Sequence, residues 1–507
     1  MYRNVLEYLE NSTIKFGNKT AFSDDKTKIT FTELMHKAMA VGSAVADVNG
    51  INSPIVVYLP KSVDCITAFL GAVYAGGFYC PIDVKMPLDR VNLIFGVLNP
   101  SVIITSQKYK DKIAEIAPKC KIILIEQAVK SDINKGKLDF VRRNMTDTDP
   151  LYTLFTSGST GVPKGVAVSH RAVIDFAEWV TEKFDITSED VLGNQGNFYF
   201  DLSVLDIYGG LKNGAEVCII PQKKFIFPVD LLNYLNEKHI TIINWVPSML
   251  CNVANMNALD AVKPLYLKKV LFCGEVMPTK QLNVWRNHLP DLLYVNLYGP
   301  TETVYACTYY IVNRDFADDE MLPIGNACEN TKIIVLNEND ELVQGDEMGE
   351  LCVAGTCLAL GYYNNPEKTH DAFVQNPANK RYNEEIYRTG DIVKYNSYGE
   401  LMYLSRKDFQ IKHLGHRIEL GEIETAIGGI PTVDDSVCVY DDLNKEICVC
   451  YTGTEISKKE FIDYLKEKIP SYMIPSKFFY MDQLPHNANG KIDRISIKKK
   501  INQRTVL

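Results

Sequence analysis

The sequence predicts a mixed α/β protein: a large N-terminal domain of parallel-rich sheets with helices and a β-rich subdomain, then a small α+β C-terminal domain. Short apolar runs alternate with segments of helical spacing as far as residue 297, which is typical of parallel sheets covered by helices on both faces. From Thr331 the runs are shorter and are separated by turn signals at 337–340 and 397–399, which predicts antiparallel strands. From Arg406 onward strands and helices mix within about 100 residues, enough for a separate compact domain.

Each expected element rests on a run of suitable residues. The apolar run at 54–59 predicts a strand, and the helical spacing at 63–74 predicts a helix that ends at Gly76 and Gly77. Further buried strands are expected at 102–105, 121–125, 215–220, 241–246, 268–272 and 292–297. In the last part, helices are expected at 421–427 and 458–468, and strands at 436–440 and 446–451.

Composition narrows the function classes. The 507 residues are 46% hydrophobic and 23% charged, as in ordinary globular proteins with two or three domains. A net charge of −9 argues against a nucleic-acid partner. No run approaches the roughly 18 apolar residues of a membrane span, and the N-terminus lacks a signal-peptide core. The 13 cysteines occur singly, which indicates reduced thiols in the cytoplasm. We expect a monomer without membrane insertion.

The segment 151–165, LYTLFTSGSTGVPKG, is the strongest local signal. An apolar strand delivers a loop that is rich in hydroxyls and backbone N–H groups and poor in side-chain bulk, as a phosphate chain requires. The expected phosphate-binding residues are Thr156, Ser157, Gly158, Ser159, Thr160, Gly161 and Lys164. The spacing differs from the common P-loop, because Val162 and Pro163 separate the second glycine from the lysine. A plain surface connector is the alternative.

Six motifs follow one another along the chain: TSGSTGVPKG, FDLSVLDIY, NLYGPTE, YRTGD, RKDFQIKHLGHRIELGEIE and NGKIDR. Together they resemble the amino-acid adenylation enzymes of nonribosomal peptide synthesis, within the acyl-adenylate-forming superfamily. CGEVMP, DLSVLDIY and DFQIK are most similar to the D-alanine–carrier protein ligases. The sequence stops just after NGKIDR, so a free-standing enzyme is expected, with an excised module as the alternative.

The resemblance implies ATP and Mg²⁺ as cofactors. Glu302, beside Thr301, would hold Mg²⁺, with a surface glutamate as the alternative. Tyr298 would face the adenine and Asn296 its amino edge, while Asp391 would accept the ribose hydroxyls. Gly274, Glu275 and Gly299 would line the same nucleotide. The expected catalytic residues are Thr156, Lys164, Glu302, Arg406 and Lys491, the last bridging carboxylate and phosphate oxygens from a mobile loop.

The expectation that the substrate is an amino acid depends on Asp201. The family places this aspartate beside the α-amino group of an amino acid, and a carboxylate removed from water needs such a partner. A helix N-cap is the alternative role. The resemblance implies a small pocket lined by Leu202, Leu205, Asn244, Leu271, Cys273, Leu297, Tyr305 and Ala306. Alanine of either hand is the expected substrate, followed by cysteine or serine.

The second expected step transfers the aminoacyl group to a phosphopantetheine thiol on a carrier protein. The resemblance implies domains at 1–405 and 406–507, with a hinge at Asp408, Gly415 beside the pantetheine and Arg417 on phosphate. Ser405 replaces the usual glycine, which predicts a stiffer loop. Glu419, Glu422 and Glu424 are interpreted as the charged start of a helix.

Two other functions are compatible with the motifs. One is an acyl- or aryl-CoA ligase that activates a carboxylic acid without an amine. The other is a catalytically inactive homologue that only binds ligands. The presence of Lys164, Glu302, Asp391 and Lys491 argues against the inactive homologue.

Overall fold

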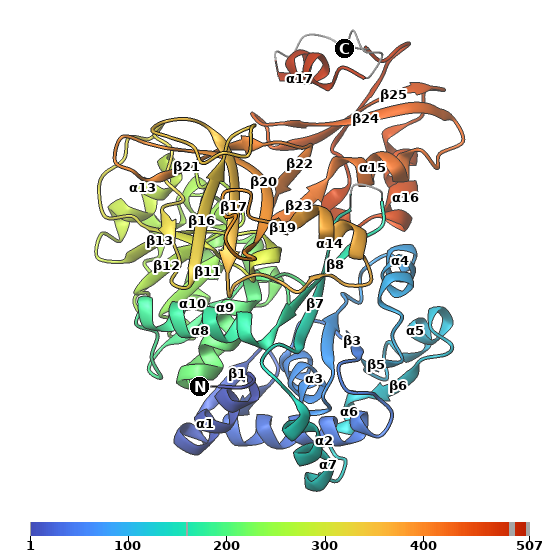
Figure 1. Ribbon diagram of the computed structural model, residues 1–507, viewed down its shortest axis with the longest axis vertical. Helices are drawn as coiled ribbons and strands as arrows, with labels where there is room; N and C mark the ends of the chain where they lie inside the picture. The colour runs from blue at the N-terminus through green and yellow to red at the C-terminus, as the bar shows by residue number, and fades with distance from the viewer. Residues whose placement is uncertain (1, 159–160, 486–491, 503–507) are drawn as a thin grey trace. The chain divides into compact units, whose positions relative to one another are not determined.

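The computed structural model describes residues 2–158, 161–485 and 492–502 (Figure 1). The chain forms two compact units. The first comprises Met1–Val84, Leu98–Leu154 and Val166–Lys407, and the second comprises Lys85–Val97, Phe155–Gly165 and Asp408–Leu507. The domain boundary at 405/406 stays a prediction from the motifs.

The first unit contains a nine-stranded sheet. Its central strands are parallel to their neighbours, and most of them are connected through helical segments, as parallel pairing requires. Those strands are β1 (Thr20–Ser23), β10 (Glu216–Ile219), β9 (Val191–Asn194), β11 (Ile242–Trp245), β12 (Lys269–Phe272) and β13 (Leu293–Tyr298). The antiparallel edges are β2 (Lys28–Thr30), β14 (Thr308–Ile311) and β15 (Asn326–Ala327).

A second sheet has seven strands. Its order is β18 (Gly361–Tyr362), β8 (Lys164–Ser169), β7 (Pro150–Thr156), β4 (Phe78–Pro81), β3 (Pro54–Tyr58), β5 (Val102–Thr105) and β6 (Lys121–Leu124). Strands β3, β4 and β5 are buried along their whole length. Continuous apolar runs such as PIVVY are therefore used as interior parallel strands.

Helices between and around these strands complete the cores of the first unit. Helix α3 (Val63–Tyr74) is buried on nearly every side, as expected for a helix that is apolar all round. Its residues share a core with α2 (Phe31–Ala46), α8 (His170–Lys183) and α9 (Leu202–Asn213) and with strands of both sheets. The remaining helices are α1 (Leu6–Phe16), α5 (Lys110–Ile116), α6 (Ile125–Ala128), α7 (Lys135–Asn144), α10 (Pro228–Glu237), α11 (Pro247–Asn255), α12 (Ala258–Ala261), α13 (Thr279–His288) and α14 (Pro366–Ala372).

The expected antiparallel subdomain is confirmed. All pairings in its sheet are antiparallel, and the turns carry Asp340 at φ 61° and Gly399 at φ 74°. The strands are β16 (Thr331–Leu336), β17 (Gly349–Gly355), β20 (Glu385–Tyr395), β19 (Phe373–Gln375) and β21 (Leu401–Arg406).

The second unit has its own core around α15 (Leu420–Ile427) and α16 (Lys458–Lys468). A capping box between Ser457 and Glu460 starts α16 at the expected residue. The other elements are α4 (Leu88–Leu98), β22 (Gln410–His413), β23 (His416–Glu419), β24 (Val433–Asp441), β25 (Glu446–Gly453), β26 (Lys477–Tyr480) and α17 (Arg494–Asn502).

The glutamates near α15 lie at the start of this helix as expected, with Glu419 at its N-cap position and Glu422 in its first turn. The sequence did not indicate that their carboxylates are paired. Glu422 forms an ion pair with Arg90, and both side chains are only 3% exposed. Glu424 pairs with Arg494, at 2.5 Å, and also accepts the Cys438 N–H. These carboxylates lie against other elements of the unit, and their cations come from distant parts of the sequence. A local charge pattern does not reveal such partners.

Two general findings concern the described residues. No helix there is long and apolar enough to cross a membrane. The 13 cysteines all lie in this part of the chain, and none forms a disulfide.

The buried His170 makes the stability of the first unit depend on pH. Its Nδ1 accepts the Val5 N–H at 3.4 Å, and burial lowers its pKa to about 3. The imidazole is therefore neutral when folded, whereas the unfolded chain takes up a proton below about pH 6.5. Between pH 7 and pH 5 this histidine should remove up to about 2 kcal/mol from the free energy of unfolding.

Urea unfolding of wild type and His170→Gln at pH 7, 6 and 5 measures this effect. The variant should lose part of the pH dependence, and the same substitution at the exposed His36 should keep it. Parallel pH dependence in wild type and His170→Gln would refute the assignment.

Candidate active site

Asp391 lies in a buried polar cluster of the first unit. Antiparallel pairing of β20 with β21 places it directly opposite Arg406, whose Nη1 donates to Asp391 Oδ1 at 2.8 Å. The Tyr298 hydroxyl donates to Oδ2, and burial raises the pKa of Tyr298 well above its usual value. Asp391 is 2% exposed. Each oxygen already has a donor, so a ligand hydroxyl would share or replace these bonds.

Asn296 lies near the carboxyl end of β13, and Gly299 follows the last residue of that strand. The Asn296 amide Nδ2 donates to the Pro323 carbonyl at 2.8 Å, which orients Oδ1 as the acceptor end. A Cβ at Gly299 would lie 2.7 Å from both Ala306 Cα and the Tyr305 carbonyl oxygen. Glycine is required here because two backbone segments approach each other closely.

Glu302 is fully buried, so the alternative of a surface glutamate was wrong. Its Oε1 accepts the Tyr362 hydroxyl at 2.7 Å. Two residues further, Val304 has φ 72° and ψ −64°, and the Tyr305 N–H bonds to the Thr303 carbonyl at 3.0 Å. This is a γ-turn with positive φ, which is rare and strained for a β-branched residue. The strain is local to the turn that joins Glu302 to Tyr305.

Glu302 and Thr301 supply carboxylate and hydroxyl oxygens, which are the donors that Mg²⁺ prefers. The described residues contain no cluster of three or more His, Cys, Asp or Glu side chains that could enclose a metal ion. Magnesium is commonly held by one or two carboxylates together with substrate phosphates and water. The donor set at Glu302 therefore fits Mg²⁺ bound as a nucleotide complex.

The expected pocket residues belong to one buried region. Asn244 and Leu271 face each other across β11 and β12, and the Tyr305 hydroxyl donates to Asn244 Oδ1 at 2.6 Å. Asn244 Nδ2 donates to the Leu202 carbonyl at 3.1 Å. The apolar members share the main core: Leu202, Leu205, Leu271, Cys273, Leu297, Tyr305 and Ala306. Both ends of the Asn244 amide thus bond to the protein.

Asp201 lies at the N-cap position of α9 but does not act as a cap. Its backbone is already helical, with φ −64° and ψ −19°, and its side chain makes no capping hydrogen bond. The side chain is partly buried. One turn later, Asp206 accepts Asn194 Nδ2 at 2.7 Å, and burial raises its pKa to about 7. The N-cap alternative for Asp201 therefore has no bond to support it.

The Ser/Gly loop that follows β7 belongs to the second unit. The Ser157 hydroxyl donates to the Arg417 carbonyl at 2.9 Å and accepts the Glu419 N–H at 3.0 Å. Lys164 Nζ lies 3.7 Å from Glu419 Oε1, while Gly161 has φ 79°. Strand β23 thus engages both a hydroxyl and the cation expected to bind phosphate. Ser159, Thr160 and Lys491 lie outside the described residues.

The expected hinge and thiol-path residues form the start of the 408–507 segment. Asp408 Oδ1 accepts the Gln410 N–H at 3.2 Å. Arg417 Nε donates to Gln410 Oε1 at 2.6 Å. Gly415, at φ 77°, occupies the turn between β22 and β23. Ser405 pairs with Ile392 inside β21, next to a shift in the pairing register, so the position lies in a strand and not in a loop.

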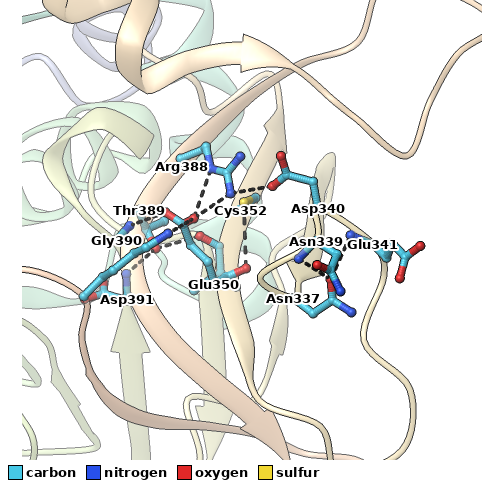
Figure 2. Close-up of polar contacts among 12 residues, drawn as sticks. Asn337, Asn339, Asp340, Glu341, Glu350, Cys352, Arg388, Thr389, Gly390 and Asp391 are labelled. Atoms are coloured by element: carbon cyan, nitrogen blue, oxygen red, sulfur yellow. Dashed lines mark hydrogen bonds and ion pairs between the residues drawn. The ribbon is translucent and has the colours of Figure 1, made fainter.

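The motif-based interpretation missed Glu350, Arg388 and Tyr362. Figure 2 shows Glu350, from β17, reaching the backbone and Arg388 side chain of β20 beside Asp391. The sequence carries a weak signal for it, a single acid in the apolar run GELCVAG. Gly274, at φ 97°, and Glu275, which accepts the Ser248 N–H at 2.8 Å, lie after β12 as expected.

Comparison with known proteins gives consistent matches. The family model described as AMP-binding enzyme matches residues 9–363, and that of the AMP-binding enzyme C-terminal domain matches 422–491. The D-alanine–D-alanyl carrier protein ligase of Bacillus cytotoxicus is 32% identical over 97% of this chain and 98% of its own length. Tyrocidine synthase 1 of Brevibacillus parabrevis is 29% identical over 97% of this chain. The chain spans 44% of that synthase.

Solved structures share the fold. The Vibrio cholerae adenylation domain AlmE, in complex with glycyl-adenosine-5′-phosphate, has a TM-score of 0.84 at 21% identity and covers 99% of this chain and 98% of its own. The o-succinylbenzoate CoA synthetase of Bacillus subtilis has the same TM-score, at 20% identity and 98% coverage of both chains. At these identities the likeness concerns the fold alone.

The Lys164–Glu419 contact predicts competition between the protein and a phosphate chain. Glu419→Gln should keep the 2.6 Å contact with Gln410 but remove the charge beside Lys164. A phosphate ligand would then no longer displace an ion pair, so ATP should bind about two- to fivefold more tightly. Calorimetric titration with ATP measures the change. Asp463→Asn, at an exposed ion pair of α16, is the matched control, and unchanged or weaker binding in Glu419→Gln would contradict the prediction.

Proposed function

Because the chain belongs to the family of AMP-binding enzymes, we propose that it activates a small amino acid with ATP and transfers it to a carrier-protein thiol. In the first step a carboxylate oxygen attacks the α-phosphorus of ATP, giving aminoacyl-AMP and pyrophosphate. In the second step a phosphopantetheine thiolate attacks the acyl carbon and AMP leaves. The observation that carries the proposal is Asp201, a partly buried carboxylate that does not cap its helix.

The residues of the first unit are suited to hold the nucleotide. Asp391 would accept the ribose hydroxyls, with Tyr298 and Arg406 holding its two oxygens in place. Asn296 would accept the adenine amino group at Oδ1. Bound Mg²⁺, held by Glu302 and Thr301, would offset phosphate charge. Charge that develops on the phosphate oxygens also requires cations. Arg406 is the candidate in this unit, and Lys164 and Lys491 are further candidates from the motifs.

Asp201 favours an amino acid over other carboxylic acids. An ammonium group gives this carboxylate a partner of opposite charge, whereas an aliphatic or aryl acid leaves it without compensation from the substrate. The names of the relatives point the same way, because one is a D-alanine–D-alanyl carrier protein ligase and another a peptide synthase. The same names support a carrier protein as the acceptor.

The pocket favours a small apolar side chain. Tyr305 occupies part of the region and is only 2% exposed. The Asn244 amide, the polar group expected to contact a substrate hydroxyl or thiol, already bonds to Tyr305 and to the Leu202 carbonyl. We therefore favour alanine, of either hand, over serine or cysteine. The cytoplasmic location and the monomeric state remain predictions from the sequence.

An acyl- or aryl-CoA ligase is the second candidate. The observation in its favour is that the o-succinylbenzoate CoA synthetase shares the fold as closely as the glycyl-adenylate-bound domain does. The fold therefore does not distinguish the two activities, and the distinction rests on Asp201 and the pocket.

ATP–pyrophosphate exchange with each of the twenty amino acids and D-alanine tests the activity. We expect exchange with one small amino acid and near-complete loss in Lys491→Ala, since that lysine is the expected bridge between carboxylate and phosphate. Exchange only with acids that lack an amine would overturn the proposal in favour of the CoA ligase.

The role of Asp201 is tested by comparing alanine with propionate, which has the same carbon chain without the amine. Asp201→Ala should reduce kcat/KM for the amino acid about 10- to 100-fold, the size of a lost charged hydrogen bond. The low activity with propionate should stay unchanged or rise. An equal loss with both acids would mean that Asp201 has only a structural role.

A further inference from the structure

Glu350 is a buried carboxylate that the proposed mechanism does not use. It lies in β17 and is 7% exposed. Four donors surround it: Arg388 Nε at 3.0 Å and Nη2 at 2.9 Å, the Gly390 N–H at 3.1 Å, and Lys407 Nζ at 3.7 Å. Figure 2 shows that Arg388 lies between Glu350 and Asp340. A buried carboxylate with this many donors fixes the groups around it.

The strand pairing explains why Glu350 contacts the backbone of β20. Glu350 pairs with Ile392, and Cys352 pairs with Arg388. Between these two pairs, β17 has the single residue Leu351 and β20 has three residues, 389–391. The extra residues of β20 form an irregular bulge. A bulge leaves backbone N–H and C=O groups without their partners in the neighbouring strand and changes the direction of side chains. Bulges are often found beside active sites.

Side chains form hydrogen bonds with backbone groups in and beside this bulge. Glu350 Oε1 accepts the Gly390 N–H, and Thr389 Oγ1 accepts the Asp391 N–H at 3.0 Å. Thr389 Oγ1 also donates to the Leu351 carbonyl at 2.7 Å. Gly390 has φ 73°, a conformation that favours glycine. The bulge thus depends on Glu350 and Thr389, and Asp391 is its last residue.

We propose that Glu350 is a positioning residue that makes the enzyme select a ribose with free hydroxyls, by fixing the bulge that directs Asp391. This inference rests on the proposed function, in which Asp391 accepts the ribose hydroxyls. Loss of the Glu350 charge weakens its bond to the Gly390 N–H and its pairing with Arg388, which also bonds to Asp340. Asp391 then has more freedom, and its bonds to the ribose weaken more than the contacts to the phosphates.

Glu350→Gln tests this with two nucleotides, ATP and 2′,3′-dideoxy-ATP, whose dissociation constants are measured by calorimetry. Wild type should prefer ATP. In the variant, ATP affinity should fall about tenfold, the size of one charge-assisted hydrogen bond, while affinity for the dideoxy nucleotide should stay as in wild type. A purely structural role would weaken both nucleotides equally.

Two further variants complete the test. Thr389→Val removes the acceptor of the Asp391 N–H and should produce the same selective loss, which covers the case in which Glu350→Gln does not fold. Glu347→Gln, at an exposed turn residue, should leave both affinities unchanged, and thermal unfolding checks that each variant is folded. Equal losses for both nucleotides, or no preference for ATP in wild type, would overturn the inference.

Pyrophosphate exchange by the same preparations separates this inference from the proposed function. If wild type prefers ATP but exchanges with no amino acid, the proposed function fails and the positioning role stands. If wild type exchanges normally but Glu350→Gln loses both nucleotides equally, the positioning role fails and the proposed function stands.

Discussion

The requirement that buried carboxylates be paired governs the candidate active site. Removing a carboxylate from water is costly unless donors replace the lost hydration. Asp391 accepts hydrogen bonds from Tyr298 and Arg406. Glu302 accepts one from Tyr362. Glu350 accepts hydrogen bonds from Arg388 and from a backbone N–H. Each donor comes from a different strand or loop than its acceptor. The sheets of the first unit therefore have to bring distant segments together accurately before these residues can be buried at all.

Backbone irregularities place these residues where the regular strands end. Asn244, Cys273 and Tyr298 lie at or just after the carboxyl ends of adjacent parallel strands, where open α/β sheets commonly bind ligands. Beyond β13 the chain makes the strained γ-turn at Val304, and in β20 it makes the bulge before Asp391. A regular strand would alternate its side chains between two faces. In β20 the bulge interrupts this alternation just before Asp391.

The sequence predicted the elements well because their signals are local. The helices at 63–74 and 458–468 begin and end at the expected residues, and the change to antiparallel pairing after Thr331 is confirmed. The partners of charged residues were not predictable, since they depend on contacts distant in sequence. Glu422 forms an ion pair with Arg90, which lies more than 300 residues earlier in the sequence. Glu350 lies beside a bulge that results from the pairing register of two strands, and no local sequence pattern predicts that register. The motifs identified Asp391, Tyr298 and Arg406, but neither the bonds among them nor Glu350.

Several groups expected to bind the substrates already have protein partners. Ser157 bonds to β23, Lys164 lies beside Glu419, and Asp391 bonds to Arg406. Such partners keep the groups satisfied without a ligand, and binding becomes an exchange of one hydrogen bond or ion pair for another. The net free energy of an exchange is small compared with the cost of leaving a buried charge alone. Under the proposed function, selectivity would follow from replacement. A ligand would bind well only if it offers a donor or charge wherever it displaces one, which a nucleotide without ribose hydroxyls or an acid without an ammonium group would not do.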